Sequence, residues 1–421
     1  MRLRRLVLVA ITLGACAGTE LRADPSPSCS YRQERATVGD AGTTFVGTIS
    51  DVVLGQRHGC AVFDRGDVRC WGGNDLHQLS GRYDPAPGEG LTYDDWRGSA
   101  DLAAGGAHTC AFNRSGVFCW GNNAAGQVDG TAEPVSGIVE VMADHGEPLS
   151  AAAGLLHTCA ADASRVVCWG HNGFGQLGRS TSSACCNEPA SISTSWGSGR
   201  TLALVAGAYH TCALVGEEDS GSVLCWGDDR FGALGEGEPG EMRTEAEPVS
   251  LEGGASAIAA GPHHTCALLT DGRVFCWGRD ESGELGDGLR RSSATPVLVE
   301  LPFAPVSLVA GGSVALSADA AGELHAGTGV GRTCAVSEDG QAMCWGDNAA
   351  GQLGDGTTID RFVPTPVAGD VFFLSVVPGG DATCGLSDTD TLLCWGDGAS
   401  GQIGSAGGSS AVPAATTVFD L

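Results

Sequence analysis

Lysine is absent from this chain of 421 residues, and all 23 basic residues are arginine. P-loop phosphate binding and lysine Schiff-base chemistry are therefore excluded. The chain carries 50 acidic residues, so its formal net charge is −27. A surface with this charge repels phosphate backbones, and nucleic acid is not expected as a partner.

Motifs of several enzyme and metal-site classes are also missing. The sequence contains no G-x-S-x-G nucleophile elbow, no H-E-x-x-H zinc motif and no EF-hand loop. We therefore expect no catalytic residues, no metal and no cofactor. The apolar run at residues 6–13 is too short to cross a bilayer as a helix.

The N-terminus has the layout of an export signal. Three arginines precede the apolar run, which predicts a signal peptide over residues 1–15. The segment Leu13-Gly14-Ala15-Cys16 resembles the bacterial lipobox, in which the cysteine is lipidated. Cys16 is then the lipid attachment site, residues 16–45 are a tether and residues 46–421 are the folded domain. Ordinary cleavage with loss of Cys16 is the alternative, and it would make the protein secreted instead of anchored in the cell envelope.

One pattern recurs seven times in the folded domain. It reads G-x-x-(H)-x-C-A, a turn, V-x-C-W-G and, six residues past the Trp, G-Q-L-G. The seven tryptophans are spaced by 49, 49, 57, 51, 68 and 50 residues, and they are Trp71, Trp120, Trp169, Trp226, Trp277, Trp345 and Trp395. A glycine stands five residues before the first cysteine of each copy, at Gly55, Gly105, Gly154, Gly207, Gly261, Gly329 and Gly379.

Each copy predicts a β-hairpin. Segments such as Ser337-Glu338-Asp339-Gly340 are turn signals between two apolar runs. The second strand is apolar on both faces, as in Val166-Val167-Cys168-Trp169, so it must be covered on both sides. A blade packed between two neighbouring blades meets that requirement.

The repeated motifs resemble those of the regulator-of-chromosome-condensation (RCC1-like) family, over about residues 50–421. The resemblance implies an all-β fold, a seven-bladed β-propeller with about 50 residues per repeat. It also implies that the ring is closed by the terminal segments, with residues 412–421 joining the N-terminal repeat. Residues 299–328 are either an insertion or a decayed repeat, which leaves the blade count open by one.

Fourteen of the 18 cysteines form seven hairpin pairs. In an exported chain they are candidate disulfides, although cysteine could instead fill a small apolar slot. The pairs are Cys60 with Cys70, Cys110 with Cys119, Cys159 with Cys168, Cys212 with Cys225, Cys266 with Cys276, Cys334 with Cys344, and Cys384 with Cys394. Cys29, Cys185 and Cys186 remain, an odd number that leaves one thiol free or paired elsewhere; zinc binding by the three is weakly supported.

Five histidines share one repeat position, two residues before the first cysteine, which favours a hydrogen-bonded structural role over catalysis. They are His58, His108, His157, His210 and His264.

Functional residues are sought where the blades differ. Aromatic residues outside the repeat are candidate partner-binding anchors, although each insertion could simply pack its own aromatic. They are Tyr83, Tyr93, Trp96 and Trp196. The expected function is a monomeric scaffold in the cell envelope, in the outer membrane or at the surface, that binds a protein or a polysaccharide and touches the membrane only through its lipid. The alternatives are an enzyme inhibitor, resembling the propeller of this family that blocks β-lactamases, and a carbohydrate-active propeller. Guanine-nucleotide exchange, known in the eukaryotic family, fits an exported acidic chain least.

Overall fold

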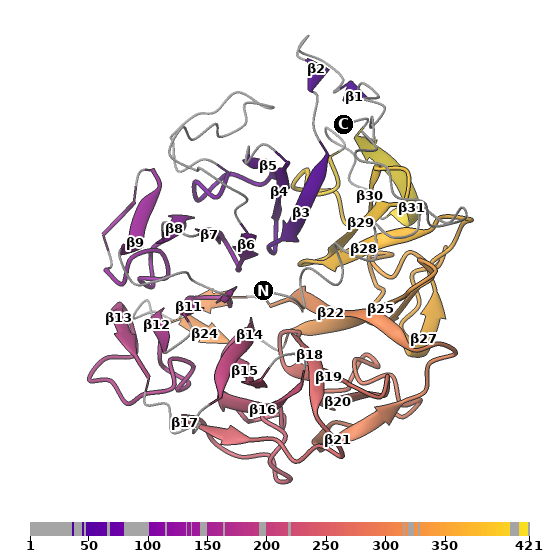
Figure 1. Ribbon diagram of the computed structural model, residues 1–421. Coiled ribbons are helices and arrows are strands. Elements are labelled where there is room, and N and C mark those ends of the chain that lie inside the picture. The colour runs from indigo at the N-terminus through magenta and orange to yellow at the C-terminus, as the bar shows by residue number, and fades with distance from the viewer. Residues whose placement is uncertain are drawn as a thin grey trace, which may run out of the picture.

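The computed structural model is a ring of β-sheets around a central axis (Figure 1). It describes residues 36–37, 44–45, 48–64, 68–79, 101–113, 116–131, 133–135, 137–143, 150–162, 165–192, 199–217, 220–314, 316–318, 324–326, 329–404 and 412–419. Within these ranges every regular element is a strand, and none is a helix that could span a membrane. The all-β prediction is confirmed.

The described strands group into seven blades, of which blades 4 and 5 are joined into one sheet by a single residue pair, Gly221 opposite Ala255. Blade 1 has β3 (Ile49–Leu54), β4 (His58–Phe63) and β5 (Val68–Gly72). Blade 2 has β6 (Asp101–Ala104), β7 (His108–Asn113), β8 (Gly116–Gly121) and β9 (Val139–Ala143). Blade 3 has β10 (Ser150–Ala153), β11 (His157–Ala161), β12 (Val166–Gly170) and β13 (Asn187–Ser191). Blade 4 has β14 (Arg200–Ala206), β15 (His210–Glu217), β16 (Ser220–Gly227) and β17 (Arg243–Pro248).

The remaining three blades follow the same order. Blade 5 has β18 (Ala255–Ala260), β19 (His264–Leu269), β20 (Val274–Gly278) and β21 (Ser293–Val299). Blade 6 has β22 (Pro305–Ser313), β25 (Val330–Ser337), β26 (Ala342–Gly346) and β27 (Arg361–Pro366). Blade 7 has β28 (Phe373–Pro378), β29 (Ala382–Ser387), β30 (Leu392–Gly396) and β31 (Val412–Phe419). Outside the blades are two short pairs, β1 (Ala36–Thr37) with β2 (Thr44–Phe45), and β23 (Leu316–Ala318) with β24 (Leu324–Ala326).

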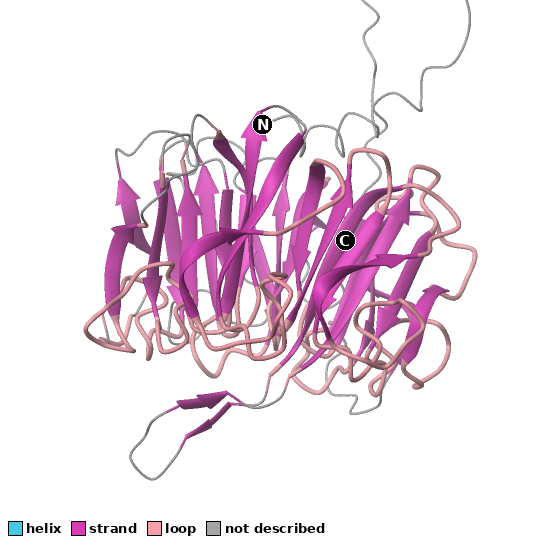
Figure 2. Cartoon of the chain, turned by 90° about the horizontal axis from the view of Figure 1, so that it is seen from below, coloured by secondary structure: helices cyan, strands magenta, loops and turns pink. Residues whose placement is uncertain are grey.

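The two faces of the ring differ. One carries the connections from the first to the second strand and from the third to the fourth strand of each blade. We call it the loop face; such connections form most of the lower edge in Figure 2. The opposite face carries the hairpin turns, such as the predicted turn in blade 6, where Gly340 has φ +82° and donates its N–H to Ser337.

Tryptophan links each blade to the one before it. All seven indole N–H groups donate to a backbone carbonyl of the preceding blade at 2.8–3.1 Å, for example Trp277 to Ala233. The last glycine of G-Q-L-G lies directly on this indole: Gly235 has φ +79°, and a Cβ there would be 2.9 Å from Trp277 Nε1. The motif is therefore an inter-blade joint.

The repeated histidines form a second joint, as their shared position predicts. The Nε2 of each lies 2.8–2.9 Å from a threonine Oγ1 of the next blade. Thr265 Oγ1 in turn donates to Ala233 O at 3.0 Å, so it accepts from His210. Burial lowers the pKa of His210 to about 4, which keeps the imidazole neutral at pH 7. Its single proton lies on Nε2, because Thr265 Oγ1 accepts a hydrogen bond there.

Two interfaces depart from this histidine–threonine pattern. In blade 6, Arg332 replaces the histidine; it donates to Thr383 Oγ1 at 2.9 Å and also to three backbone carbonyls of blade 7. At the junction of blades 7 and 1 both partners are missing, because Ala382 and Gly59 occupy their positions. A Cβ on Gly59 would lie 2.6 Å from the Trp71 ring, which fills that space.

The expected closure by residues 412–421 is wrong. β31 pairs with β30 and so completes the seventh blade from its own repeat. The ring closes by packing between blades 7 and 1, where Trp71 Nε1 donates to Gln402 O at 2.8 Å and Gly380 N donates to Gly55 O at 2.9 Å. Since the seventh repeat supplies its own outer strand, that strand does not cross this junction.

Residues 299–328 contain no additional described blade. They hold β22, the first strand of blade 6, and the short pair β23–β24 inserted before β25. This insertion also shows that Gly329 was wrongly aligned. The register places Val309 opposite Cys334, so the glycine two residues later, Gly311, is the counterpart of Gly55.

All seven expected hairpin disulfides are present. Each joins directly opposed residues of the second and third strands, with Cα atoms 4.0–4.1 Å apart, for example Cys266 and Cys276. An eighth disulfide joins Cys185 to Cys186. Among the three cysteines left over, two therefore pair with each other, whereas Cys29 lies outside the described residues.

Candidate functional site

The centre of the loop face is a narrow opening. Its cavity holds about 110 Å³ and is lined by one segment from each blade, mostly glycine and alanine. Backbone bonds join neighbouring segments there, such as Gly106 N to Gly154 O at 3.1 Å and Ala208 N to Pro262 O at 3.0 Å. Small residues are required because a Cβ on Gly105 would be 2.3 Å from Gly154 O. We call this ring of small residues the central collar; the opening it leaves has room for little more than water.

Around this opening, the blades differ at a few repeat positions. The fourth and fifth residues past the Trp are alanine or serine in blades 2, 6 and 7. Blade 3 has Phe174 at the fifth position, and blade 4 has Arg230 and Phe231 at the two positions. The residue before the repeated histidine is bulky in the same region, with Tyr209 in blade 4 and His263 in blade 5. We call this group on blades 3 to 5, together with Arg279, the aromatic–arginine patch.

Blades 3 and 4 meet through rings and a guanidinium. The rings of Phe174 and Tyr209 are 4.6 Å apart, and the Arg230 Cζ lies 4.7 Å from the Phe174 ring centroid. Asp228 holds that guanidinium with two hydrogen bonds of 2.8 Å. Because the carboxylate is 4% exposed and the arginine 43%, the cation is fixed at its base while its outer edge faces solvent.

Blades 4 and 5 repeat this arrangement. Phe231 lies 5.0 Å from the His263 ring, and the Arg279 Cζ is 5.7 Å from the Phe231 centroid. Arg279 is ion-paired with exposed Glu281, and its Nη1 is 3.9 Å from buried Glu284. Burial raises the pKa of Glu284 to about 7.

Several buried polar atoms of the patch have no hydrogen-bond partner among the described residues. They are the Tyr209 hydroxyl, His263 Nε2, and Nε and Nη1 of Arg279. Burial raises the pKa of Tyr209 to about 12 and lowers that of His263 to about 4, so both side chains are neutral at pH 7. A buried polar group without a hydrogen bond costs about 1–3 kcal/mol, so the packing of blades 3 to 5 carries an energetic cost at these atoms.

None of the site residues predicted from sequence is a member of this patch. Tyr83, Tyr93, Trp96 and Trp196 lie outside the described residues, as does Cys16. The same holds for most of the tether. In the part of the chain that the structure describes, no group of three or more His, Cys, Asp or Glu side chains could hold a metal ion.

The sequence analysis did not predict this patch because it sought functional residues outside the repeat. The signal lies within the repeat: when the seven copies are aligned, blades 3 and 4 have bulky side chains at positions where blades 2, 6 and 7 have alanine or serine. The contacts between blades were not visible in the sequence.

Two family models, both described as the regulator of chromosome condensation (RCC1) repeat, match the chain. One matches residues 49–78, 100–127, 255–284 and 320–352, and the other 165–214, 220–268, 271–314 and 339–386. The chain is 32% identical over 167 residues to the ultraviolet-B receptor UVR8 of Arabidopsis thaliana, covering 39% of this chain and 34% of the receptor. It is 29% identical over 195 residues to the secretion-regulating guanine nucleotide exchange factor of Bos taurus, covering 46% and 41%.

Solved structures share the fold. Yeast RCC1 (Prp20) bound to Kap60 aligns with a TM-score of 0.68 at 18% identity, over 96% of this chain and 91% of that one. Human WBSCR16 aligns with a TM-score of 0.66 at 20% identity, over 80% and 86%. The chain spans less than half the length of the two curated relatives. The matched repeats cover most of the propeller, and the chain belongs to the RCC1-repeat family.

Proposed function

We propose that this propeller is a scaffold that binds a protein partner through the aromatic–arginine patch on blades 3 to 5. The observation that carries the proposal is the Arg230 guanidinium, which buried Asp228 holds over the Phe174 ring while its outer edge faces solvent. Tyr, Phe and Arg are the residue types that dominate protein interfaces.

A protein partner fits better than a polysaccharide. One solved relative, the yeast protein Prp20, is described as binding proteins: Gsp1p and histones in one structure, and Kap60 in another. The patch offers the exposed guanidinium of Arg230, whose donors suit backbone carbonyls and carboxylates of a polypeptide. Binding, not catalysis, is the proposed role, because the five repeated histidines are already engaged between blades.

We further propose that the protein works outside the cytosol, anchored through Cys16 or secreted. The seven hairpin disulfides support this, because such bonds persist in oxidising compartments. Disulfide mapping of protein isolated without reductant tests it: free thiols in all hairpins would place the chain in a reducing compartment instead.

Site-specific photo-crosslinking in the cells that make the protein tests the binding patch. A photoreactive phenylalanine replaces Phe174 in the patch or, as a matched control, Phe372, which is 48% exposed and packs beside the Gly340 turn on the opposite face. We expect one partner to crosslink from position 174 alone, and Arg230→Ala to reduce its yield at least tenfold. Equal crosslinking from both positions, or no effect of Arg230→Ala, would overturn the proposal.

A further inference from the structure

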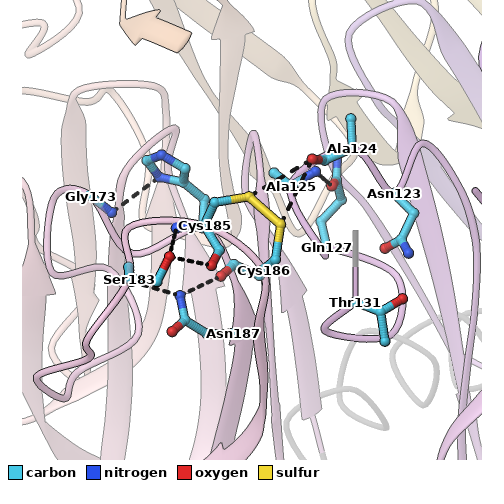
Figure 3. The surroundings of a disulfide bond; sticks show 12 residues. Asn123, Ala124, Ala125, Gln127, Thr131, Gly173, Ser183, Cys185, Cys186 and Asn187 are labelled. Carbon is cyan, nitrogen blue, oxygen red and sulfur yellow. Dashed lines mark hydrogen bonds between the residues drawn. A yellow bond between two sulfur atoms is a disulfide. The ribbon is translucent and has the colours of Figure 1, made fainter. Parts of the chain in front are cut away.

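Two adjacent cysteines form a disulfide on the loop face, in the connection between β12 and β13 of blade 3 (Figure 3). Both Sγ atoms face the neighbouring blade, 3.9 and 4.0 Å from the Ala124 carbonyl oxygen. The Cys186 N–H also donates to Ala125 O at 3.3 Å. The linked pair therefore holds the blade 3 loop against the blade 2 loop.

The loop is shaped around this bond. Cys186 has φ +60°, a conformation that non-glycine residues rarely adopt. Ser183 Oγ accepts from the Cys185 N–H at 3.2 Å, and Asn187 Nδ2 donates to Ser183 O at 3.2 Å. Gly126 of blade 2 lies so close that a Cβ on it would be 2.9 Å from the Cys186 Cα. Opening the disulfide removes the covalent restraint on a tightly fitted joint.

This disulfide differs from the other seven because both of its cysteines are partly exposed. Thirteen of the fourteen hairpin cysteines are at most 1% exposed, because strands and neighbouring blades cover them; the exception, Cys70, is partly buried and bonded to Cys60, which is 0% exposed. Cys185 and Cys186 are both half-buried, and Ser182, Ser183 and Ala184 before them are exposed. Thiol–disulfide exchange requires a thiolate to reach a sulfur atom, so exposed disulfides are the labile ones.

We propose that Cys185–Cys186 is a reducible site, which a dithiol opens while the seven hairpin disulfides remain closed. One thiolate of the dithiol attacks a protein sulfur, the S–S bond breaks and a mixed disulfide forms. The second thiol of the reductant then displaces the protein sulfur. Two electrons and two protons pass to the protein, which ends with two thiols, and the dithiol ends as a disulfide.

Reduction then loosens the joint between blades 2 and 3. Without the bond, Cys186 is free to leave its positive φ and its contact with Ala125. Cys185 also packs against the apolar cluster that includes Leu155, Phe174 and Tyr209. Reduction of this pair therefore changes the packing of the loop face around Phe174 and Tyr209. The strands of the blades stay in place, because their own disulfides remain closed.

Differential alkylation of the full chain, isolated without reductant, tests the proposal. Native protein is incubated with graded dithiothreitol, quenched with an alkylating reagent and mapped with trypsin, which releases both cysteines in the peptide spanning residues 180–200. We expect labelling of this peptide at a dithiothreitol concentration at least tenfold below that needed for any hairpin cysteine. Simultaneous or later labelling, or thiols already free in the isolated protein, would overturn the proposal.

Hydrogen exchange provides a second readout. On selective reduction, we expect amide exchange to rise at least fivefold in the blade 3 loop and at residues 124–126, and to stay constant in the strands. The double variant Cys185→Ser with Cys186→Ser should show the raised exchange without reductant and no further change with it. A reduced protein whose loops exchange as slowly as the oxidised one would refute the coupling to the blade 2 joint.

Discussion

Replacing His210 by glutamine tests the histidine joint between blades. In the native protein, the His210 ring is 1% exposed and donates from Nε2 to Thr265 Oγ1 at 2.9 Å. His210→Gln loses the ring packing against Gly207 and weakens this bond. We expect a loss of about 2–3 kcal/mol in the free energy of unfolding at pH 7.

The pH dependence of the free energy of unfolding distinguishes the loss of a buried neutral imidazole from a simple loss of packing. Burial lowers the pKa of His210 from 6.5 to about 4, so below pH 6.5 the unfolded chain binds a proton that the folded chain does not. Stability from this group is therefore present above pH 6.5 and is lost as the pH falls toward 4. At pH 5 the native protein has lost about 2 kcal/mol through His210, whereas the glutamine variant has lost none of it.

The stability deficit of His210→Gln, the amount by which its free energy of unfolding falls below that of the native protein, should thus shrink from about 2–3 kcal/mol at pH 7 to about 0–1 kcal/mol at pH 5. Guanidinium unfolding with disulfides intact, followed by tryptophan fluorescence at both pH values, measures it. Thr265→Val is the control, because it keeps the buried imidazole and should show a similar deficit at both pH values. An undiminished deficit for His210→Gln at pH 5 would refute a depressed pKa at His210.

Two further predictions use the same unfolding measurement. Gly207→Ala should lower the free energy of unfolding by about 3 kcal/mol, because its Cβ would be 2.2 Å from His210 Cε1 and 2.5 Å from the Gly261 carbonyl oxygen. The control is Gly240→Ala, whose Cβ has its nearest neighbour 3.7 Å away and should change stability by less than about 0.5 kcal/mol. Equal effects of the two substitutions would count against steric crowding at the central collar. Arg332→Lys should cost about 2 kcal/mol, because an ammonium cannot reproduce the bonds that the guanidinium makes to blade 7; an unchanged unfolding midpoint would show that those bonds contribute nothing.

The repeat made the architecture readable from sequence. Residues such as Val166 and Val167 are apolar on both faces of one strand, and only a sheet covered on both sides buries them. The hairpin disulfides were predictable from local geometry, because cysteines on the two strands of a tight hairpin lie opposite each other, as Cys266 and Cys276 do. The shared position of the histidines indicated their structural role, although not the threonine that accepts from them.

The candidate site was not predictable to the same degree. Tyr209 and Phe174 are 35 residues apart, and His263 and Phe231 are 32 apart, so only the packing of successive blades brings each pair into contact. The pairing of Cys185 with Cys186 was left open by the sequence, because a count of three remaining cysteines does not show which two are joined.

By itself, the sequence determined the fold class, the repeat length and the cross-strand cysteine pairs, because these depend on local periodicity and on neighbours within one hairpin. Only the tertiary structure decided how the ring closes, that Gly311 and not Gly329 completes the central collar, and that residues of blades 3 to 5 form one patch. These features depend on contacts between blades, and those contacts are set by how a whole blade packs against the next, which no single repeat encodes.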